Sequence, residues 1–513
     1  MTRATGLIAK FATVGAATMA SRVLGLVREM LMAATLAAGP VADVFYTCFR
    51  FPNLFRRLFA EGAFNIAFVP LFAKELEQGG EEAAREFGQQ VFSVLASWLI
   101  IFTGVAIVFM PYLVATIVAP GFSDTPEKFE LSVTVTRIMF PYLLCMSLVA
   151  MFSGILNSLR KYFLAAFVPV LLNVILVAIL LAALWFELPA RETGLALAWG
   201  VFASGFLQLI FLVIGIRQKG MYFGLTMPRI TPAVKRLLVL MLPAMLTGGV
   251  LQINLLIGTI IATMQDGANA LLNYADRLNQ LPLGVIGIAV GVVLLPELTR
   301  ALNSGDDEKA QVLQNRSLEF AFALTLPAAI GFMIIPEDIV RLIYERGAFD
   351  ETTTQLTAAA LFGFATGLPA YVLIKVFQPA FFAHEDMRTP FYYSCIMVAV
   401  NVALSLALFP TYGHVAIAIA TSVSSWVNVI LLAGTQWFRS SFRPDRETLK
   451  RLTVILVAGA IMAGLLALIR DPLADQFLMQ NFLTQLIFVG ALICISAVVY
   501  FAVLFGGGVR LSK

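Results

Sequence analysis

Residues 21–64 read SRVLGLVREMLMAATLAAGPVADVFYTCFRFPNLFRRLFAEGAF, and they place charged side chains inside apolar segments long enough to span a membrane. The first of these segments begins near Gly6 and ends near Gly39, so Arg22 lies roughly 24 Å into it at the helical rise of about 1.5 Å per residue. A charge at the centre of a bilayer costs about 2.5–3.5 kcal/mol even on the most permissive scale. Several such charges in one helical hairpin indicate a watery cavity lined by protein.

The composition identifies the class of protein. Hydrophobic residues make up 60% of the 513 residues and charged residues 13%, and the mean hydropathy is +0.88. A soluble domain has about 45–50% apolar and about 25% charged residues. The sequence therefore predicts an all-α integral membrane protein that crosses the bilayer many times. The four cysteines and two histidines lack the spacing of metal ligands, so we expect no metal site, no cofactor, no enzymatic activity and no nucleic-acid partner.

A window of about twenty residues gives the membrane spans. The second span is the least regular, because Pro52 and Gly62 interrupt it, and the acidic residues 337–351 are predicted to form a solvated turn. We expect about fourteen transmembrane helices, near residues 6–38, 41–73, 88–118, 129–157, 162–186, 193–216, 234–264, 268–299, 315–335, 353–382, 389–409, 413–437, 450–469 and 481–506.

Basic residues orient these spans. They concentrate in the turns after the sixth and twelfth spans, whereas the opposite turns are poor in positive charge or balanced. By the positive-inside rule both termini are cytoplasmic, which agrees with an even number of spans. The basic residues of the two turns are Arg217, Lys219, Arg229, Lys235 and Arg236, then Arg439, Arg443, Arg446, Lys450 and Arg451.

The chain also repeats itself. FVPLFAKELEQGGEEA (68–83) resembles LLPELTRALNSGDDEKA (294–310), and Asn173 in LLNVIL corresponds to Asn401 in AVNVAL. We predict two pseudo-symmetric six-helix bundles with the same topology and two further helices at the C-terminus. Parallel repeats of this kind belong to transporters, with a substrate site between the halves near the bilayer midplane. The predicted boundaries are 1–220, 230–440 and 441–513.

The deep charges of the first span admit two readings. Arg22 and Glu29 share a helix face, and Arg28 is displaced by roughly 120° on a straight helix. Because guanidinium groups pair bidentately with phosphate, these arginines favour an anion-binding site. The alternative is a structural ion pair between Arg28 and a carboxylate, either Glu29 or Asp43. Both readings stay open from the sequence.

Two further charged groups are equally ambiguous. Arg56 and Glu61 could pair across the Ala60–Gly62 turn and serve as a gate or as scaffold. Asp276 and Arg277 could neutralise each other, or Arg277 could be a third arginine of the cavity. The two repeat-related asparagines are interpreted as hydrogen-bonding bridges between helices, with cation coordination by the second as the minority reading.

Three segments carry a resemblance to a known family. ASRVLGLVRE (20–29), DVFYTCFRFPNLFRRLFAEGAFNIAFVP (43–70) and YADRLNQLPLGVIGIAVGVVLLPEL (274–298) closely resemble the MurJ (MviN) family. These are bacterial lipid II flippases within the multidrug/oligosaccharidyl-lipid/polysaccharide exporter superfamily. The resemblance covers essentially the whole chain. It implies two six-helix bundles and a lipid-tail groove formed by the last two helices.

The resemblance also implies an activity. The family moves lipid II, undecaprenyl-pyrophosphoryl-disaccharide-pentapeptide, from the cytoplasmic to the periplasmic leaflet of the bacterial inner membrane during peptidoglycan biosynthesis, which maintains the cell wall and cell shape. Expected partners are lipid II and membrane phospholipids, with cell-wall synthesis proteins as candidates. Alternating access through a central arginine-lined cavity is the expected mechanism. Coupling to the membrane potential or to a monovalent ion is left open.

The family's functional residues carry over by position. Its cavity arginines match Arg22, Arg28 and Arg277, and its essential second-helix charges match Asp43 and Arg56. Two residues depart from the family pattern. Glu29 occupies a position where an aspartate is common in the family, and Gln280 occupies one where some members have a carboxylate. Both differences weaken the expectation, carried over from the family, that this chain couples transport to protons or cations.

Rival functions make different demands. A cation-coupled multidrug or polysaccharide-lipid exporter of the same superfamily should carry cavity carboxylates without partners, whereas the deep charges here are mainly arginines. A membrane enzyme acting on polyprenyl phosphates would need clustered aspartates or histidines at a cytoplasmic face, and the sequence has no such pattern.

Overall fold

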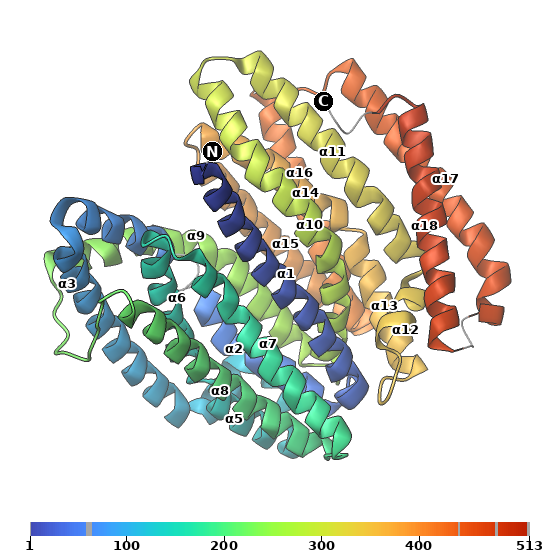
Figure 1. Ribbon diagram of the computed structural model, residues 1–513. Helices are drawn as coiled ribbons and strands as arrows, with labels where there is room; N and C mark the ends of the chain where they lie inside the picture. The colour runs from blue at the N-terminus through green and yellow to red at the C-terminus, as the bar shows by residue number, and fades with distance from the viewer. Residues whose placement is uncertain (1, 58–63, 440–441, 478–480, 510–513) are drawn as a thin grey trace. The chain divides into compact units, whose positions relative to one another are not determined.

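The computed structural model describes residues 2–57, 64–439, 442–477 and 481–509, and it is α-helical throughout these ranges, without a β-strand (Figure 1). The predicted all-α membrane class is confirmed. Ten helical segments of the described chain are long and apolar enough to cross a bilayer, which is consistent with the fourteen expected spans without fixing that number. Glu61 lies outside the described residues.

The helices have the following bounds: α1 Thr2–Leu36, α2 Pro40–Phe55, α3 Phe64–Val108, α4 Met110–Leu113, the π-helix η2 Val114–Val118, the 3₁₀-helix η3 Pro120–Phe122, α5 Pro126–Met139, α6 Tyr142–Ser158, α7 Tyr162–Trp185, α8 Ala190–Arg217, α9 Pro232–Ala262, α10 Ala268–Asn303, α11 Asp307–Ile334, α12 Pro336–Tyr344, α13 Glu351–Ala365, α14 Leu368–Ala383, α15 Arg388–Tyr412, α16 His414–Phe438, α17 Arg446–Phe477 and α18 Phe482–Gly506.

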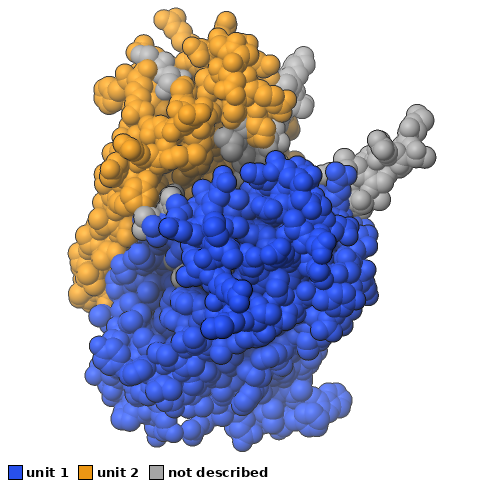
Figure 2. All heavy atoms as spheres, turned by 90° about the vertical axis from the view of Figure 1, so that its left-hand side faces the viewer, with its two compact units in different colours: residues 1–270 blue, residues 271–513 orange. Residues whose placement is uncertain are grey.

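The chain forms two compact units, residues 1–270 and 271–513, coloured separately in Figure 2. In the first unit α1 packs along α7, α7 along α8, and α6 against both α3 and α8, while α2 lies against α5. Small residues allow close approach: a Cβ on Gly205 of α8 would lie 2.9 Å from the Tyr142 ring of α6. The α9 helix, which was expected to open the second bundle, packs on α3 in the first unit. The repeat boundaries themselves stay a prediction.

The chain breaks between the second and third predicted spans, which end near residue 73 and begin near residue 88. Within α3, which is continuous in its bounds from Phe64 to Val108, two helical segments meet at a kink at Gly80, with φ of 76°. Residues 74–87 are polar but consist mainly of Lys, Glu, Gln and Ala, which are strong helix formers. The polar residues on both sides of the kink are therefore helical, and only the kink itself departs from helical geometry.

The second unit is built around α11, α14 and α16. The core includes Leu318 of α11, Phe377 and Phe381 of α14 and Leu432 of α16, all buried. The α17 and α18 helices pack on each other, and α17 packs on α11. The C-terminal pair is thus an integral part of this unit.

The acidic segment 337–351 is not the solvated turn that was predicted. Residues Pro336–Tyr344 form α12, and Asp338 is buried there with an ion pair to Arg470 of α17, at 3.1 Å between Oδ2 and Nε. A proline in the first turn and two acidic residues near the N-terminus favour a helix start at this point. The acidic side chains of this segment were expected to face solvent. Instead, Glu337 and Asp338 lie in the first turn of a helix, and Asp338 forms a buried ion pair.

Candidate functional site

The first charged cluster joins three helices around Arg28. Its Nη2 donates to Glu29 Oε1 at 2.5 Å and its Nη1 to Asn173 Oδ1 at 2.9 Å, while the Tyr46 hydroxyl donates to Glu29 Oε2 at 2.5 Å. Glu29 is fully buried and the Arg28 side chain is 13% exposed. The carboxylate therefore has a cation and a phenol as partners, which compensates its removal from water.

Asn173 links this cluster to Ser21, which lies two turns earlier in α1. Its amide nitrogen donates to the Ser21 carbonyl at 3.1 Å, so one side chain of α7 holds α1 at two points, Ser21 and Arg28. The predicted role of Asn173 as a bridge between helices is confirmed. Of the two carboxylates considered as partners of Arg28, Glu29 is the one bonded to it.

Arg22 lies apart from this cluster. Its side chain is exposed on α1, and it makes no hydrogen bond or ion pair within the described part of the chain. An arginine in that state inside an apolar helix is able to accept an anionic ligand without breaking an existing contact. Its proposed role in substrate binding stays a prediction.

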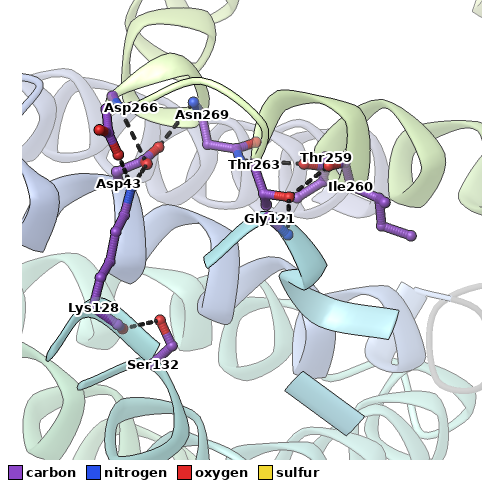
Figure 3. A network of polar contacts seen from close by, with 10 residues as sticks. Asp43, Gly121, Lys128, Ser132, Thr259, Ile260, Thr263, Asp266 and Asn269 are labelled. Atoms are coloured by element: carbon purple, nitrogen blue, oxygen red, sulfur yellow. Dashed lines mark hydrogen bonds and ion pairs between the residues drawn. The ribbon is translucent and has the colours of Figure 1, made fainter. Parts of the chain in front are cut away.

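Asp43 belongs to a second network, shown in Figure 3. Its Oδ2 accepts from Lys128 Nζ at 2.7 Å and from the Gly267 amide at 3.2 Å, and its Oδ1 accepts from the Asn269 amide at 2.9 Å. Lys128 also contacts Asp266 at 2.8 Å. The side chains of Asp43 and Lys128 are almost fully buried, whereas that of Asp266 is 89% exposed. Asp43 thus ties α2 to α5 and to the turn before α10.

The polar contacts around Asp43 continue along α9. Thr259 accepts from Arg50 Nη1 at 2.9 Å through its hydroxyl, and Thr263 accepts from the Gly121 amide at 3.1 Å (Figure 3 shows both threonines). A Cβ on Gly121 would lie 2.4 Å from the Thr263 carbonyl oxygen, so only glycine permits this approach. The network fixes the end of α9 against α2 and η3.

Sequence reasoning missed Lys128. It lies in the first turn of α5, one residue before the expected span 129–157, with Glu127 and Glu130 beside it in the sequence. Its partner Asp43 is 85 residues earlier, so no local spacing could pair them. The one available signal was that Asp43, inside an apolar helix, required a cation from elsewhere in the chain.

Arg56 lines a cavity of about 400 Å³ within the first unit. Asn65 and Asn157 line the same cavity, together with Ser153, Tyr162 and apolar side chains of α1, α6 and α7. The Arg56 Nε donates to Asn53 Oδ1 at 2.7 Å. The predicted pairing of Arg56 with Glu61 cannot be placed, because Glu61 is outside the described residues.

The second unit holds Asp276 and Arg277, both half-buried on α10. Asp276 accepts a hydrogen bond from Gln280 one turn later. Just before them, the fully buried ring of Tyr274 packs against those of Tyr344 and Phe349, with centroids 5.2 and 5.5 Å away. This aromatic cluster anchors the start of α10 beside the two charged residues.

No group of three or more His, Cys, Asp or Glu residues in the described ranges could hold a metal ion. In the first unit Arg28 is paired with Glu29, and Lys128 with Asp43 and Asp266, while in the second unit Asp276 and Arg277 are adjacent on α10. Such groups bind anions and hydroxylated headgroups by charge and hydrogen bonding.

Comparison with known proteins assigns the family. Residues 32–488 match the family model described as lipid II flippase MurJ. A probable lipid II flippase MurJ of Rhizobium tropici is 50% identical over 502 residues, covering 97% of this chain and 94% of that protein. The chain belongs to the MurJ family of lipid II flippases.

Solved structures show the MurJ fold. The inward closed conformation of lipid II flippase MurJ matches with a TM-score of 0.78 at 24% identity, covering 96% of this chain and 99% of that one. An inward-facing multidrug resistance MATE family transporter of the MOP superfamily matches at 0.67 and 14% identity, covering 82% and 95%. The resemblance to the family inferred from the sequence motifs is confirmed, and these structures share the fold of the chain.

Proposed function

We propose that this protein transports lipid II from the cytoplasmic to the periplasmic leaflet of the bacterial inner membrane, as a transporter and not as an enzyme. The observation that carries the proposal is the match to lipid II flippases along nearly the whole chain, at 50% identity in the case quoted above. The many apolar helices support a multi-pass membrane location.

The proposed substrate contacts are the arginines of both units. Lipid II carries a pyrophosphate, and a charge inside an apolar layer needs opposite charge nearby because Coulomb energies grow as the effective dielectric constant falls. Arg22 is available on α1 without breaking a contact, Arg28 lies six residues further along the same helix, and Arg277 is supplied by α10. We propose that these three bind the pyrophosphate, with Glu29, Asp43, Arg56, Glu61 and Asp276 as gating or supporting residues.

The isoprenoid tail would lie along the C-terminal helices. The α17 and α18 helices present exposed apolar side chains, among them Leu456, Leu468, Ile487 and Val498, to the surrounding lipid. A surface of this kind supports contact with an alkyl chain and with membrane phospholipids. We propose that these helices form the groove for the tail while the headgroup crosses by alternating access.

The rival export of cationic drugs is less well supported. A carrier for cations needs carboxylates that are available to the cargo, but the buried carboxylates Glu29 and Asp43 of the first unit are bonded to Arg28 and Lys128. For an anionic headgroup, the membrane potential could supply energy directly, about 2.3 kcal/mol per charge per 100 mV. We propose no cofactor.

Complementation tests the proposal. The chain is expressed in a bacterium whose own lipid II flippase is depleted, and growth and peptidoglycan synthesis are measured. We expect both to be sustained. If the protein is present in the inner membrane at normal levels and the cells still stop peptidoglycan synthesis and lyse, the proposed function is wrong.

A further inference from the structure

A polar stripe runs along one side of α14 in the second unit. Tyr371, Lys375 and Gln378 follow one another at intervals of four and three residues, which places them on one helix face. All three are half-buried, while the other side of the helix, including Leu373, Val376, Phe377 and Ala380, is part of the hydrophobic core. The stripe therefore lies on the side of α14 opposite to the residues that form the hydrophobic core.

Lys375 is the unexplained member of this stripe. It lies roughly 12 Å before the end of the helix at Ala383, at about 1.5 Å per residue, inside a segment apolar enough to span a membrane. Within the described chain its ammonium group makes no hydrogen bond and no ion pair. An ammonium group in an apolar helix without a partner is expensive, so such a residue is a functional candidate by default.

Two half-buried arginines of the second unit have carboxylate partners. Arg470 pairs with Asp338, and Arg451 pairs with Glu319 at 3.0 Å between Nη1 and Oε2. The buried Lys128 of the first unit is also paired with a carboxylate, that of Asp43. Lys375 differs from all three, which indicates that its partner comes from outside the chain.

The surroundings of the stripe connect it to the residues already considered. The Tyr371 hydroxyl lies 3.1 Å from Ser422 Oγ on α16, which fixes the ring next to Lys375. Asp276 of α10 is close enough to this hydroxyl to influence it electrostatically, so the Tyr371 end of the stripe faces the Asp276 region of α10. Arg277 is the next residue on α10 and belongs to the same unit.

We propose that Lys375 is a further substrate-contacting residue, which binds an anionic oxygen group of the lipid-linked headgroup. This inference rests on the proposed function. The oxygen group is either a phosphate of the pyrophosphate or a carboxylate of the peptide. A flexible lysine suits either one, because its point-like ammonium group accepts many approach directions.

Binding to the purified full-length protein tests this assignment with two probes, undecaprenyl pyrophosphate and complete lipid II. The variants are Lys375→Met, which keeps the length of the side chain, Lys375→Arg, which keeps the charge, and Lys309→Met as a control at an exposed lysine of α11. We expect Lys375→Met to weaken binding about tenfold or more, the value of one hydrogen bond between charged groups. Lys375→Arg and Lys309→Met should stay close to the unmodified protein.

The two probes separate the sources of the anionic group. Weaker binding of both probes assigns Lys375 to the pyrophosphate, and weaker binding of lipid II alone assigns it to the disaccharide-peptide part. If the Lys375→Met variant binds both probes as tightly as the unmodified protein does, the assignment of Lys375 is wrong and the proposed function still stands. If the unmodified protein binds neither probe, the proposed function fails and the assignment fails with it.

A second measurement covers the case in which Lys375→Met does not fold. The unmodified protein is treated with an amine-reactive reagent with and without lipid II, and modification of Lys375 and Lys309 is quantified by mass spectrometry. We expect lipid II to protect Lys375 and to leave Lys309 unchanged. Equal modification of Lys375 with and without lipid II would show that the lysine has only a structural role.

Discussion

At the scale of single residues, the contacts of Arg28 fit both interpretations that the sequence left open, the structural ion pair and the anion-binding site. Its bonds to Glu29 and Asn173 use only part of the five N–H donors of a guanidinium group, and the side chain keeps 13% of its surface exposed. The neighbouring carboxylate orients the group and leaves donors for a ligand. An ion pair and a substrate contact are therefore compatible in this geometry.

A double substitution separates these roles. Arg28→Ala should abolish or severely reduce transport at unchanged membrane level, because a pyrophosphate contact is lost. Adding Glu29→Gln removes the carboxylate that would otherwise be left buried without its cation, and transport should still be lost. Complementation and protein level are measured for the single and double variants. Recovery of transport in the double variant would assign Arg28 to the scaffold.

The Asp43–Lys128 pair predicts a different response, in stability. Lys128→Met should destabilise the protein by about 3–5 kcal/mol, because it leaves a buried carboxylate without its cation. Adding Asp43→Asn should recover much of that loss. Thermal unfolding in detergent measures both effects, with Lys309→Met as the exposed control. A Lys128→Met protein as stable as the control would show that Asp43 is compensated by its backbone amide donors alone.

At the scale of elements, the turn between α14 and α15 is organised by one carboxylate. Asp386 accepts from the Thr389 amide at 3.0 Å and from its hydroxyl at 2.7 Å, and Arg439 at the end of α16 donates to it at 2.9 Å. The Thr389 amide, followed by the Arg439 guanidinium, lowers the pKa of Asp386 to about 2. The charged carboxylate thus holds the turn against α16.

This turn should give a pH-dependent contribution to stability. The folded-state pKa is below the ordinary value of 3.8, so the stabilisation is fully present above that value and is lost as the pH falls towards about 2. At neutral pH the Asp386→Asn variant should melt below the unmodified protein, and the two should converge as the pH is lowered through this range. Melting temperatures measured from pH 7 to pH 2 check this, and a constant difference would contradict it.

The elements also show how far sequence reasoning reaches. Hydropathy predicts apolar spans well, because only a helix satisfies its backbone inside a bilayer. It does not predict where a helix ends in water, so the first part of α3 stays helical past residue 73 as far as the kink at Gly80, and α12 forms in an acidic segment. Arg28 and Glu29 are adjacent in the chain, and their pairing was foreseeable. The Asp43–Lys128 contact required the packing of α2 on α5, which no local pattern specifies.

At the scale of the whole molecule, the family match and the long apolar helices identify a membrane protein of the MurJ family, while the two-fold repeat stays a prediction. The orientation in the membrane follows from the basic turns and predicts cytoplasmic termini. With the native cysteines replaced, a single cysteine in the 187–192 turn should react with an impermeant thiol reagent added to intact cells. One in the 217–236 segment should react only after the cells are opened. The reverse pattern would invert the topology.

Direct observation of lipid II on the outer face of the inner membrane tests the central claim. In cells depleted of their own flippase, the fraction of lipid II that an externally added lipid II-cleaving enzyme can reach is measured. We expect this chain to restore that fraction and its Arg22→Ala variant, at equal membrane level, to leave it low. If lipid II stays inaccessible although the unmodified protein is present in the inner membrane, the protein does not transport lipid II.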